Sequence, residues 1–416
     1  MIRSGEATAG HRASDLIGSV RSAVDGGRSW LLVGLTVSFV YIAWTLLTLM
    51  HFSAQDFIHV GRSFVERSHA SQTISSYPGY RFDGEIGYDG EFNYFIALDP
   101  AQAAPYIDYP AYRYTRILYP LLAGALGGGN PDLVANALIA INLVMIALGI
   151  GVLGAWLRRR GASAWLAAVY GFYPGLFVAL QRDTSEIVAY SLVIVALYLY
   201  DFGPRWRLVL SAVFFALAAL TRETTLVFAY VWSFGLLLAG EGAIVARLRA
   251  NWRRFVPFLA ISFGPLVVWK VFVWVWLGSF GLQGVLSPVP FTGLHYLIRH
   301  EVEMEQLRTV VVPALLCLGA AILALWARIR RLEIWALFIN SLLYMAFLSP
   351  ASFDDFTSSA RVTVPIALAA VLAAPYLPPR AKPWFWVPAA LWLTPMIFWI
   401  FLPVESGLQE LVLHRL

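Results

Sequence analysis

Apolar runs of about 20 residues recur along the whole chain, and each is long enough to span a ~30 Å hydrocarbon core as a helix. Because lipid offers no partners to backbone N–H and C=O groups, this pattern predicts an all-α polytopic membrane protein. We expect about 11 transmembrane helices of this length. They cover residues 30–51, 132–156, 163–181, 185–203, 205–221, 223–240, 255–280, 308–327, 332–349, 359–377 and 384–403.

The distribution of charge predicts how these spans are oriented. A polar tail, residues 1–29, precedes the first span; it is too long and polar for a secretory leader, so we expect an uncleaved signal anchor. Basic clusters fall on the same side as this tail, at residues 158–160, 205–207, 247–254, 328–331 and 380–382. By the positive-inside rule, that side and the N-terminus are cytoplasmic.

One apolar segment, 116–128, is too short to cross and is expected to pack as a half-buried helix or a re-entrant piece. If it crossed, every later span would be inverted and the basic clusters would face outward. The whole chain, 1–416, is read as a single transmembrane domain with two outer loops, 52–115 and 281–307.

The first outer loop is expected to carry juxtamembrane helices. Residues 54–69 place Phe57, Val60, Phe64 and Val65 at helical spacing, which predicts an amphipathic helix on the membrane surface. A second helix is expected to begin at Asp89 or Gly90 and to stop before Pro100. The C-terminal stretch ESGLQELVLHRL is weakly amphipathic and is expected to rest on the outer surface.

Composition narrows the chemistry. The chain is 59% hydrophobic and 13% charged, and its single cysteine, Cys317, excludes a disulfide framework and argues against a thiol nucleophile. Arginine greatly outnumbers lysine, which is typical of GC-rich bacterial genomes. No Gly-rich phosphate loop, nucleotide fingerprint or Ser-His-Asp arrangement is present, so neither a soluble nucleotide site nor a nucleic-acid partner is expected.

The stretch RFDGEIGYDGEFNY, residues 81–94, gathers four carboxylates: Asp83, Glu85, Asp89 and Glu91. An aromatic-Asp-Gly-Glu sequence occurs in it twice. Asp89 has a simple structural alternative as a helix N-cap, but capping accounts for one or two acids only. Crowded carboxylates raise one another's pKa or recruit a cation. The motif therefore predicts a general base, which we favour, or a divalent-cation site for Mg²⁺ or Mn²⁺.

Three arginines, Arg182, Arg222 and Arg361, lie at the outer ends of predicted spans beside this acidic motif. Each has a structural alternative, an ion pair with a nearby carboxylate: Asp183 or Glu186 for Arg182, Glu223 for Arg222, and Asp354 or Asp355 for Arg361. Asp183 and Glu186 also resemble a capping box. Together the three arginines suit an anionic headgroup, because a guanidinium binds phosphate through two parallel hydrogen bonds.

Further candidates flank the acidic motif. Arg113 and Arg116 lie where the first loop re-enters the membrane, and they contact either a ligand or, by snorkelling, the interface. Aromatic side chains that could stack on sugars are Tyr88, Phe92, Tyr94 and Tyr112. The acidic and histidine-containing run 295–305 lacks HExxH spacing and predicts a solvated loop or a short surface helix.

The chain resembles the C-type (GT-C) superfamily of integral-membrane glycosyltransferases, which use polyprenyl-phosphate sugars. The resemblance rests on YDGEFNYFIALDP with PAYRYTRILYPLLAGAL, FYPGLFVALQRDTSEIVAYSLVIVAL, ALAALTRETTLVFA and SARVTVPIALA. It extends to bacterial cell-surface glycopolymer proteins and, more distantly, to the second mannosyltransferase of GPI-anchor assembly.

The resemblance implies an inverting transfer of a sugar, mannose by the more distant likeness, from a polyprenyl-phosphate donor to a glycan or glycolipid acceptor at the outer face of a bacterial plasma membrane. Asp89 would be the general base, with Asp83 as its rival. Arg222 and Arg361 would hold the donor phosphate, with Arg182 as a further candidate, and Glu186 and Glu223 would line the site.

A lipid-linked-sugar flippase or transporter is the rival interpretation. Transporters place ionisable groups near the bilayer midplane and are often built from repeated halves. Here Lys270 is the one charge predicted in the middle of a span, and the acids collect on one side. This distribution favours an enzyme.

Overall fold

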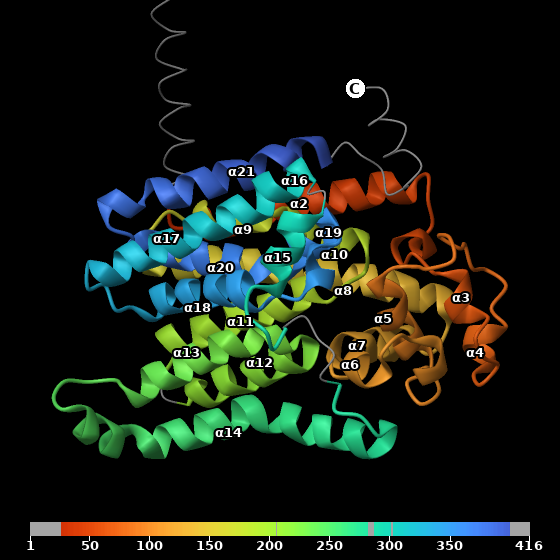
Figure 1. The fold of residues 1–416 in the computed structure, drawn as a ribbon, viewed down its shortest axis with the longest axis horizontal. Coiled ribbons are helices and arrows are strands. Elements are labelled where there is room, and N and C mark those ends of the chain that lie inside the picture. Colours follow the sequence, from red (N-terminus) through yellow and green to blue (C-terminus); the bar gives the residue numbers. More distant parts are fainter. Residues whose placement is uncertain (1–25, 205, 282–286, 301–302, 400–416) are drawn as a thin grey trace, which may run out of the picture.

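The structure is a computed structural model that describes residues 26–204, 206–281, 287–300 and 303–399. Within these ranges the chain is helical, and the one strand-like pairing is an isolated bridge between Val60 and Phe82. Most of the N-terminal tail and the C-terminal stretch expected on the outer surface lie outside the described residues. Most long helices run side by side, with the helices of the first predicted loop gathered at one end (Figure 1).

Four described helices are long and apolar enough to cross a membrane. They are α2 (Ser29–Leu49), α8 (Pro131–Arg159), α14 (Ile244–Leu277) and the continuous segment Met304–Trp326, which includes α17 (Val312–Trp326). A fifth arises if the bent pair Phe356–Val362, which is α19, and Val364–Tyr376, which begins with α20 (Val364–Ala373), counts as one span; its bend is 44°. The protein is thus helical, with apolar helices suited to a membrane.

The remaining predicted spans are also helical, but they are shorter or broken. The shorter helices are α11 (Glu186–Phe202), α12 (Arg207–Thr221), α13 (Leu226–Leu237), α18 (Leu332–Phe347) and α21 (Pro383–Trp399). The predicted span 163–181 is divided into α9 (Leu166–Gly171) and α10 (Pro174–Gln181). Pro174 causes this break, because proline has no N–H to continue the helix from the preceding turn.

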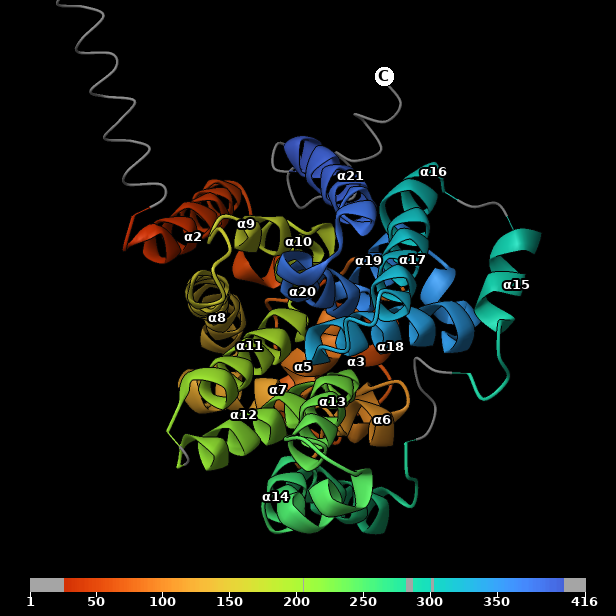
Figure 2. The same cartoon turned by 90° about the vertical axis from the view of Figure 1, so that its left-hand side faces the viewer.

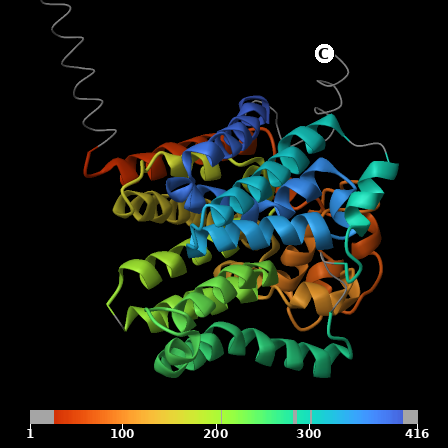
Figure 3. The ribbon, with the colours of Figure 1, turned by 60° about the vertical axis from the view of Figure 1, so that its left-hand side comes forward.

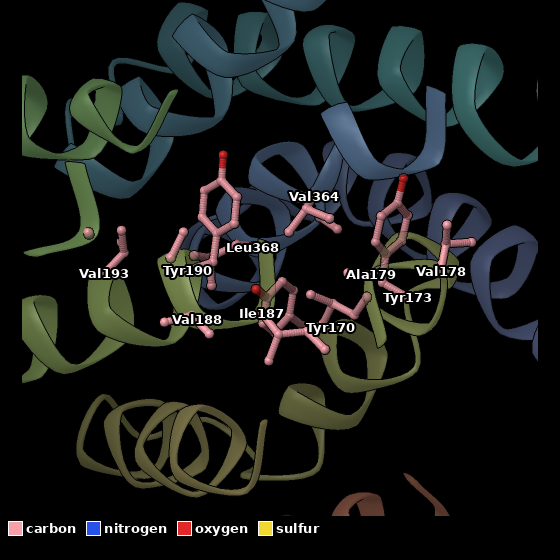
Figure 4. Close-up of a cluster of buried hydrophobic side chains, with 14 of the residues drawn as sticks. Tyr170, Tyr173, Val178, Ala179, Ile187, Val188, Tyr190, Val193, Val364 and Leu368 are labelled. Carbon is pink, nitrogen blue, oxygen red and sulfur yellow. The ribbon is translucent and has the colours of Figure 1, made fainter. Parts of the chain in front are cut away.

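Helix α20 lies at the centre of the apolar core. All ten of its residues are buried, as expected for a helix that is apolar on every side. Leu368 and Val364 lie beside Ile187 and Tyr190 of α11 and beside Tyr170 of α9 (Figure 4). Helix α14 lies at one edge of the bundle, where it packs on α12 and α13 and exposes most of its remaining surface (Figures 2 and 3).

The first predicted loop folds into short helices. The predicted helix over 54–69 is wrong: the chain forms a turn at Ala54–Phe57 and α3 (Arg62–Val65), separated by His59 in the left-handed region with φ 54°. The bridge between Val60 and Phe82 fixes this break. The four apolar side chains that suggested a helix are nevertheless buried.

The rest of this region agrees better with the prediction. Helix α5 (Asp89–Leu98) begins at the expected residue and ends before Pro100. It is preceded by α4 (Gln72–Ser75) and followed by α6 (Pro110–Tyr114) and α7 (Leu118–Gly127). Helix α7 packs on α5 and α8 with one face buried, in agreement with the half-buried helix predicted for 116–128.

Ion pairs tie the helices together at the end opposite α5. Arg160, just after α8, lies 2.6 Å from Asp201 of α11 and 3.9 Å from Glu333 of α18. The Trp156 indole N–H donates to Asp201 at 2.7 Å. Helices α8 and α11 therefore run in the same direction, from the α5 end to this one.

Candidate functional site

Asp89 lies at the start of α5 between two arginines from other helices. Tyr88 is the N-cap residue, so the N-cap alternative for Asp89 is wrong; Asp89 is the first helical residue. Its Oδ1 accepts from Arg113 Nη2 at 2.8 Å and its Oδ2 accepts from Arg361 Nη2 at 2.7 Å. Burial opposes ionisation, but these two guanidinium groups outweigh it and hold the pKa of Asp89 well below its usual range.

A chain of alternating charges continues from Asp89 into the protein. In order it comprises Asp108, Arg113, Asp89, Arg361, Glu186 and Arg222. Arg222 lies 2.8 Å from Glu186, and Arg361 lies 3.5 Å from the same carboxylate oxygen. These side chains come from five segments far apart in the sequence, so the site is assembled by tertiary packing. Buried ions of this kind require paired partners, which each of them has here.

A further ion pair, between Arg116 and Glu223, lies next to this row of charges. Arg116 binds Glu223 at 2.7 and 3.0 Å and also contacts the Tyr112 hydroxyl. The side chains of Arg113 and Arg116 are only 12% and 7% exposed, so neither snorkels to a lipid interface. Both arginines instead join the cluster around Asp89.

Asp89 and four arginines line a narrow polar cavity of about 10 Å³. Its lining residues are Asp89, Asn93, Arg113, Arg116, Thr184, Ser185, Arg222 and Arg361. The Asp89 side chain is 29% exposed, whereas those of Arg222 and Arg361 are 4% and 6% exposed. Asp89 is therefore more accessible than the arginines that pair with it.

The motif Tyr88-Asp89-Gly90-Glu91 has a separate structural reason at each position. The Tyr88 ring lies between two cations, 4.8 Å from the Arg182 guanidinium and 4.7 Å from that of Arg361. A Cβ on Gly90 would lie 2.1 Å from the Arg182 carbonyl oxygen, so only glycine permits this close approach of α5.

Glu91 anchors the preceding loop rather than the cavity. It is fully buried, and its Oε2 accepts from the Gly61 N–H at 2.8 Å. Its Oε1 has no hydrogen-bond partner within the described ranges. Burial raises the pKa of Glu91 to about 8, so near neutral pH this carboxyl group retains its proton.

The first copy of the motif has a different environment. The Asp83 Oδ2 lies 2.6 Å from His59 Nδ1, and Arg182 Nη1 lies 2.9 Å from the same nitrogen. The hydrogen bond from His59 is the main reason that the pKa of Asp83 is lowered. Asp83 is not among the residues that line the polar cavity. Glu85 is exposed, and Arg62 approaches it only to 3.9 Å.

The four carboxylates of the motif thus lie in four different environments, and the expectation that they crowd together is wrong. In the described ranges no group of three or more His, Cys, Asp or Glu side chains could hold a metal ion. A divalent cation would need ligands from a substrate or from residues outside these ranges. The four arginines of the cavity already supply positive charge beside Asp89.

The local ion pairs considered for the three outer arginines do not form. Arg222 pairs with Glu186, and Arg361 pairs with Asp89 and Glu186. Arg182 contacts His59 and Tyr88 instead of the neighbouring carboxylates, and it does not line the polar cavity. Two of the carboxylates considered as local partners have other contacts. Asp355 caps α19 by accepting from the Ser358 N–H, and Glu223 binds Arg116.

Two of the aromatic candidates are core residues. Tyr94 is fully buried, and its hydroxyl accepts from Gln55 at 3.0 Å. Phe92 is 5% exposed and carries the Arg113 guanidinium 4.5 Å from its ring centre. Neither ring is available to a sugar. Tyr88 and Tyr112 do lie beside the arginine cluster.

An apolar cavity of about 500 Å³ adjoins the polar one. Its apolar lining comes mainly from α13, α18 and the start of α20, with Leu226, Val227, Tyr230, Ile339, Leu343, Tyr344, Leu348, Val362 and Pro365. Tyr112 and Glu223 also line it, and both contact Arg116 of the polar cavity. The apolar cavity therefore ends at the arginine cluster.

Several residues of this site were not predicted from the sequence. Asp108 lies 2.6 Å from Arg113, and its position five residues earlier in the sequence is a weak signal. Asn93 lines the cavity and donates to the Asp183 carbonyl at 3.0 Å, and its place one helical turn after Asp89 is a usable signal. Nothing in the sequence points to His59, because its partners are distant.

The fold and site together define a helical protein with apolar helices suited to a membrane and a buried cluster of arginines and carboxylates at one end. Comparison of the chain with protein families, curated proteins and solved structures finds no match.

Proposed function

We propose that the protein is an inverting glycosyltransferase of the GT-C type. It would transfer a sugar, mannose by the distant resemblance, from a polyprenyl phosphate to a glycan or glycolipid acceptor. The observation that supports this most is the junction of two cavities. A partly exposed carboxylate and four arginines lie where an apolar cavity of about 500 Å³ ends. A lipid-linked phosphate needs both environments side by side.

The arginines are the proposed phosphate ligands. Arg222, Arg361 and Arg116 line the polar cavity, and each is paired with a carboxylate. A guanidinium carries five N–H donors, so each arginine retains donors for a phosphate oxygen. Arg182 is a weaker candidate, because it faces His59 and Tyr88. The prenyl chain would occupy the apolar cavity.

Donor binding and base activation are coupled in this proposal. Asp89 accepts a proton poorly while Arg113 and Arg361 hold both of its oxygens. A donor phosphate competes for Arg361, which weakens one of these ion pairs and makes the carboxylate more basic. Asp89 thereby becomes an effective base only when the donor is bound.

The transfer itself is a single displacement. Asp89 takes the proton of the acceptor hydroxyl while that oxygen forms a bond to the anomeric carbon. The bond from this carbon to the phosphate oxygen breaks, and its electron pair leaves with the phosphate, so the configuration inverts. General-base help of this kind contributes about 10²–10⁴-fold. Each arginine on the leaving phosphate adds stabilisation of a few kcal/mol.

The proposed topology keeps 11 spans, a cytoplasmic N-terminus and a site on the periplasmic or extracellular side of the plasma membrane. The positions of the helix ends relative to the arginine cluster support this topology. The starts of α11 and α13 and the end of α12 contribute to the arginine cluster, whereas the ends of α8 and α11 meet the start of α18 far from it. Helices α11, α12 and α13 therefore alternate in direction, which is consistent with the alternation that this proposal expects along the chain.

One observation favours the rival function, a lipid-linked-sugar flippase or transporter. Lys270 lies in the middle of a predicted span, and it lines the apolar cavity. A cation inside a lipid-sized cavity could guide a charged headgroup through the membrane. The Lys270 ammonium donates to the Phe280 carbonyl at 3.2 Å, which gives it a structural partner as well.

The test uses the purified protein in liposomes, a panel of radiolabelled polyprenyl-phosphate sugars and a membrane-glycan acceptor extract. Asp89→Asn and Asp83→Asn are compared with the wild type. We expect label to move to acceptor in the wild type and in Asp83→Asn, and not in Asp89→Asn. The opposite result for the two variants would assign the base to Asp83. Donor crossing the bilayer of sealed vesicles without transfer would support the flippase.

A further inference from the structure

A third cavity lies at the other end of the helices from Asp89. It has a volume of about 500 Å³ and is formed where the start of α2 meets α8 and α11. Its lining residues are Gly27, Trp30, Val152, Ala155, Arg158, Arg159 and Tyr198. The cavity thus combines two guanidinium groups, two aromatic side chains and a short apolar wall.

The three consecutive arginines at the end of α8 have different roles. Arg160 pairs with Asp201 and Glu333 and is a structural ion. Arg159 packs its guanidinium 5.1 Å from the Tyr198 ring centre, and Arg158 donates to the Gly26 carbonyl. No ion pair of Arg158 or Arg159 with a carboxylate occurs among the residues that the structure describes. Their remaining N–H donors are available to a ligand.

From this arrangement we infer that the cavity binds an anionic phospholipid, with its phosphodiester between Arg158 and Arg159 and an acyl chain along Val152 and Ala155. Among the residues that the structure describes, those lining the cavity include no carboxylate, so their charge matches a headgroup with net negative charge and disfavours a zwitterionic one. Arginine forks bind phosphate oxygens in a bidentate manner.

The aromatic residues fit the same occupant. Tryptophan and tyrosine are enriched at the level of the lipid headgroups, where an apolar ring and a polar edge are both satisfied. Trp30 at the first turn of α2 and Tyr198 near the end of α11 line the cavity together with the arginines. Ala155 and Val152 lie about one and two helical turns before the arginines, respectively, which is the direction of the bilayer interior.

The binding test uses native mass spectrometry of the delipidated full-length protein in detergent. Equimolar phosphatidylglycerol and phosphatidylcholine with identical acyl chains are the probes. We expect phosphatidylglycerol to be retained about tenfold more than phosphatidylcholine, which corresponds to ~1.4 kcal/mol. Equal retention of the two lipids would overturn the proposal. So would displacement of the bound lipid by an equal concentration of soluble glycerol phosphate, since the ligand would then be a phosphate and not a lipid.

Two variants locate the site. Arg158→Gln with Arg159→Gln is expected to abolish the preference for phosphatidylglycerol. The matched control is Arg253→Gln with Arg254→Gln, two adjacent exposed arginines of α14 that do not line this cavity, and it should keep the preference. If the control loses the preference as fully as the first variant, the total positive charge of the protein explains the binding, and the assignment of the lipid to this cavity is wrong.

A third variant protects the test against a folding defect in the double arginine change. Val152→Trp places a bulky indole on the wall proposed to contact the acyl chain and leaves both arginines in place. We expect it to lose bound phosphatidylglycerol while its thermal unfolding midpoint in phosphatidylcholine matches that of the wild type. Retention of phosphatidylglycerol by this variant would show that the lipid lies elsewhere. The inference is independent of the proposed transferase activity, because no readout involves sugar transfer.

Discussion

The carboxylate of Asp89 is held by two guanidinium groups, yet it is the most accessible ion of its cluster. An ion pair of this kind strengthens the charged form and reduces proton affinity, which conflicts with the role of a base. The conflict is removed if an incoming anion takes one arginine. Residues around Asp89 can therefore be separated into those that bind the anion and those that keep the carboxylate in place.

Arg222 belongs to the first group. It lines the polar cavity but does not touch Asp89, so Arg222→Gln should weaken donor binding more than it slows the chemical step. We expect KM for the donor to rise about tenfold or more, as for the loss of a charge-assisted hydrogen bond. Arg182→Gln is the control outside the cavity. Equal effects of both changes on KM would contradict the assignment.

Gly90 tests the packing of the motif. A Cβ at this position would lie 2.1 Å from the Arg182 carbonyl oxygen, so Gly90→Ala must displace either α5 or the Arg182 backbone. We expect a lower unfolding temperature and loss of transfer. Gly264→Ala in α14 is the matched control, because a Cβ there meets no atom within 4 Å. A Gly90→Ala variant as stable and active as this control would refute the close approach.

Glu91 should make stability depend on pH. Its pKa is raised from 4.5 to about 8, chiefly by burial and further by Asp108 and Asp89, while the Gly61 N–H and Arg113 act in the opposite direction. Between these two pKa values the folded protein holds a proton that the unfolded chain has released. The free energy of unfolding therefore falls as pH rises through this window, by up to a few kcal/mol.

Glu91→Gln should remove this dependence, since the amide oxygen still accepts from the Gly61 N–H and carries no charge. The measurement is the thermal unfolding midpoint between pH 5 and pH 9. We expect the wild type to lose stability over this range more steeply than the variant. Parallel curves would mean that Glu91 does not hold a proton in the folded state.

At the scale of the elements, ion pairs join segments that are far apart in the chain. The pair of Arg116 and Glu223 fastens the turn after α6 to the start of α13, next to the junction of the two cavities. Removing one partner leaves the other charge buried and uncompensated, which costs about 3–5 kcal/mol.

A double-mutant cycle measures this connection. Arg116→Met and Glu223→Gln should each destabilise the protein, and the double variant should lose less than the sum of the two. We expect a coupling energy of about 1–3 kcal/mol from unfolding in a detergent titration. Additive effects would show that the pair does not contribute to holding these segments together.

Elements were predictable where a local signal dominates. Helix α5 could be placed because Asp89 and Pro100 mark its two ends. The residues 54–69 could not, because the bridge from Val60 to Phe82 and the left-handed conformation of His59 override a helical pattern. Their periodic apolar residues correctly predicted burial but not backbone conformation.

The partners of the arginines were not predictable for a related reason. Arg222 is followed directly by Glu223, yet it pairs with Glu186, and Glu223 pairs with Arg116. Neighbouring charges in a sequence compete with distant ones, and helix packing decides between them. The sequence predicted only that Asp89, Arg361 and Arg222 lie on the same side of the membrane, not that they form one cluster. It gave no signal for the apolar cavity beside them.

At the scale of the whole molecule, hydropathy located the helices better than it located the spans. Each predicted span contains helix, but α12 has 15 residues and reaches only about 22 Å. This is less than the ~30 Å of a hydrocarbon core, so short helices must combine with adjoining turns or neighbours to cross. Thr225 and Glu223, for example, extend α13 through a short 3-10 turn.

The orientation of the chain can be tested because it has a single cysteine. Cys317 is buried in α17, and Cys317→Ala gives a parent without thiols. Single cysteines are then placed by Glu85→Cys, in the exposed loop before α5, and by Glu241→Cys, in the exposed turn between α13 and α14. A membrane-impermeant maleimide is applied to intact cells and to permeabilised cells.

The proposed topology places an odd number of crossings between these two positions. We therefore expect Cys at position 85 to react in intact cells and Cys at position 241 to react only after permeabilisation. If both react in intact cells, the number of crossings between them is even, as it would be if α7 traversed the membrane. If only position 241 reacts, the arginine cluster faces the cytoplasm, where a polyprenyl-phosphate sugar would have to be used on the inner leaflet.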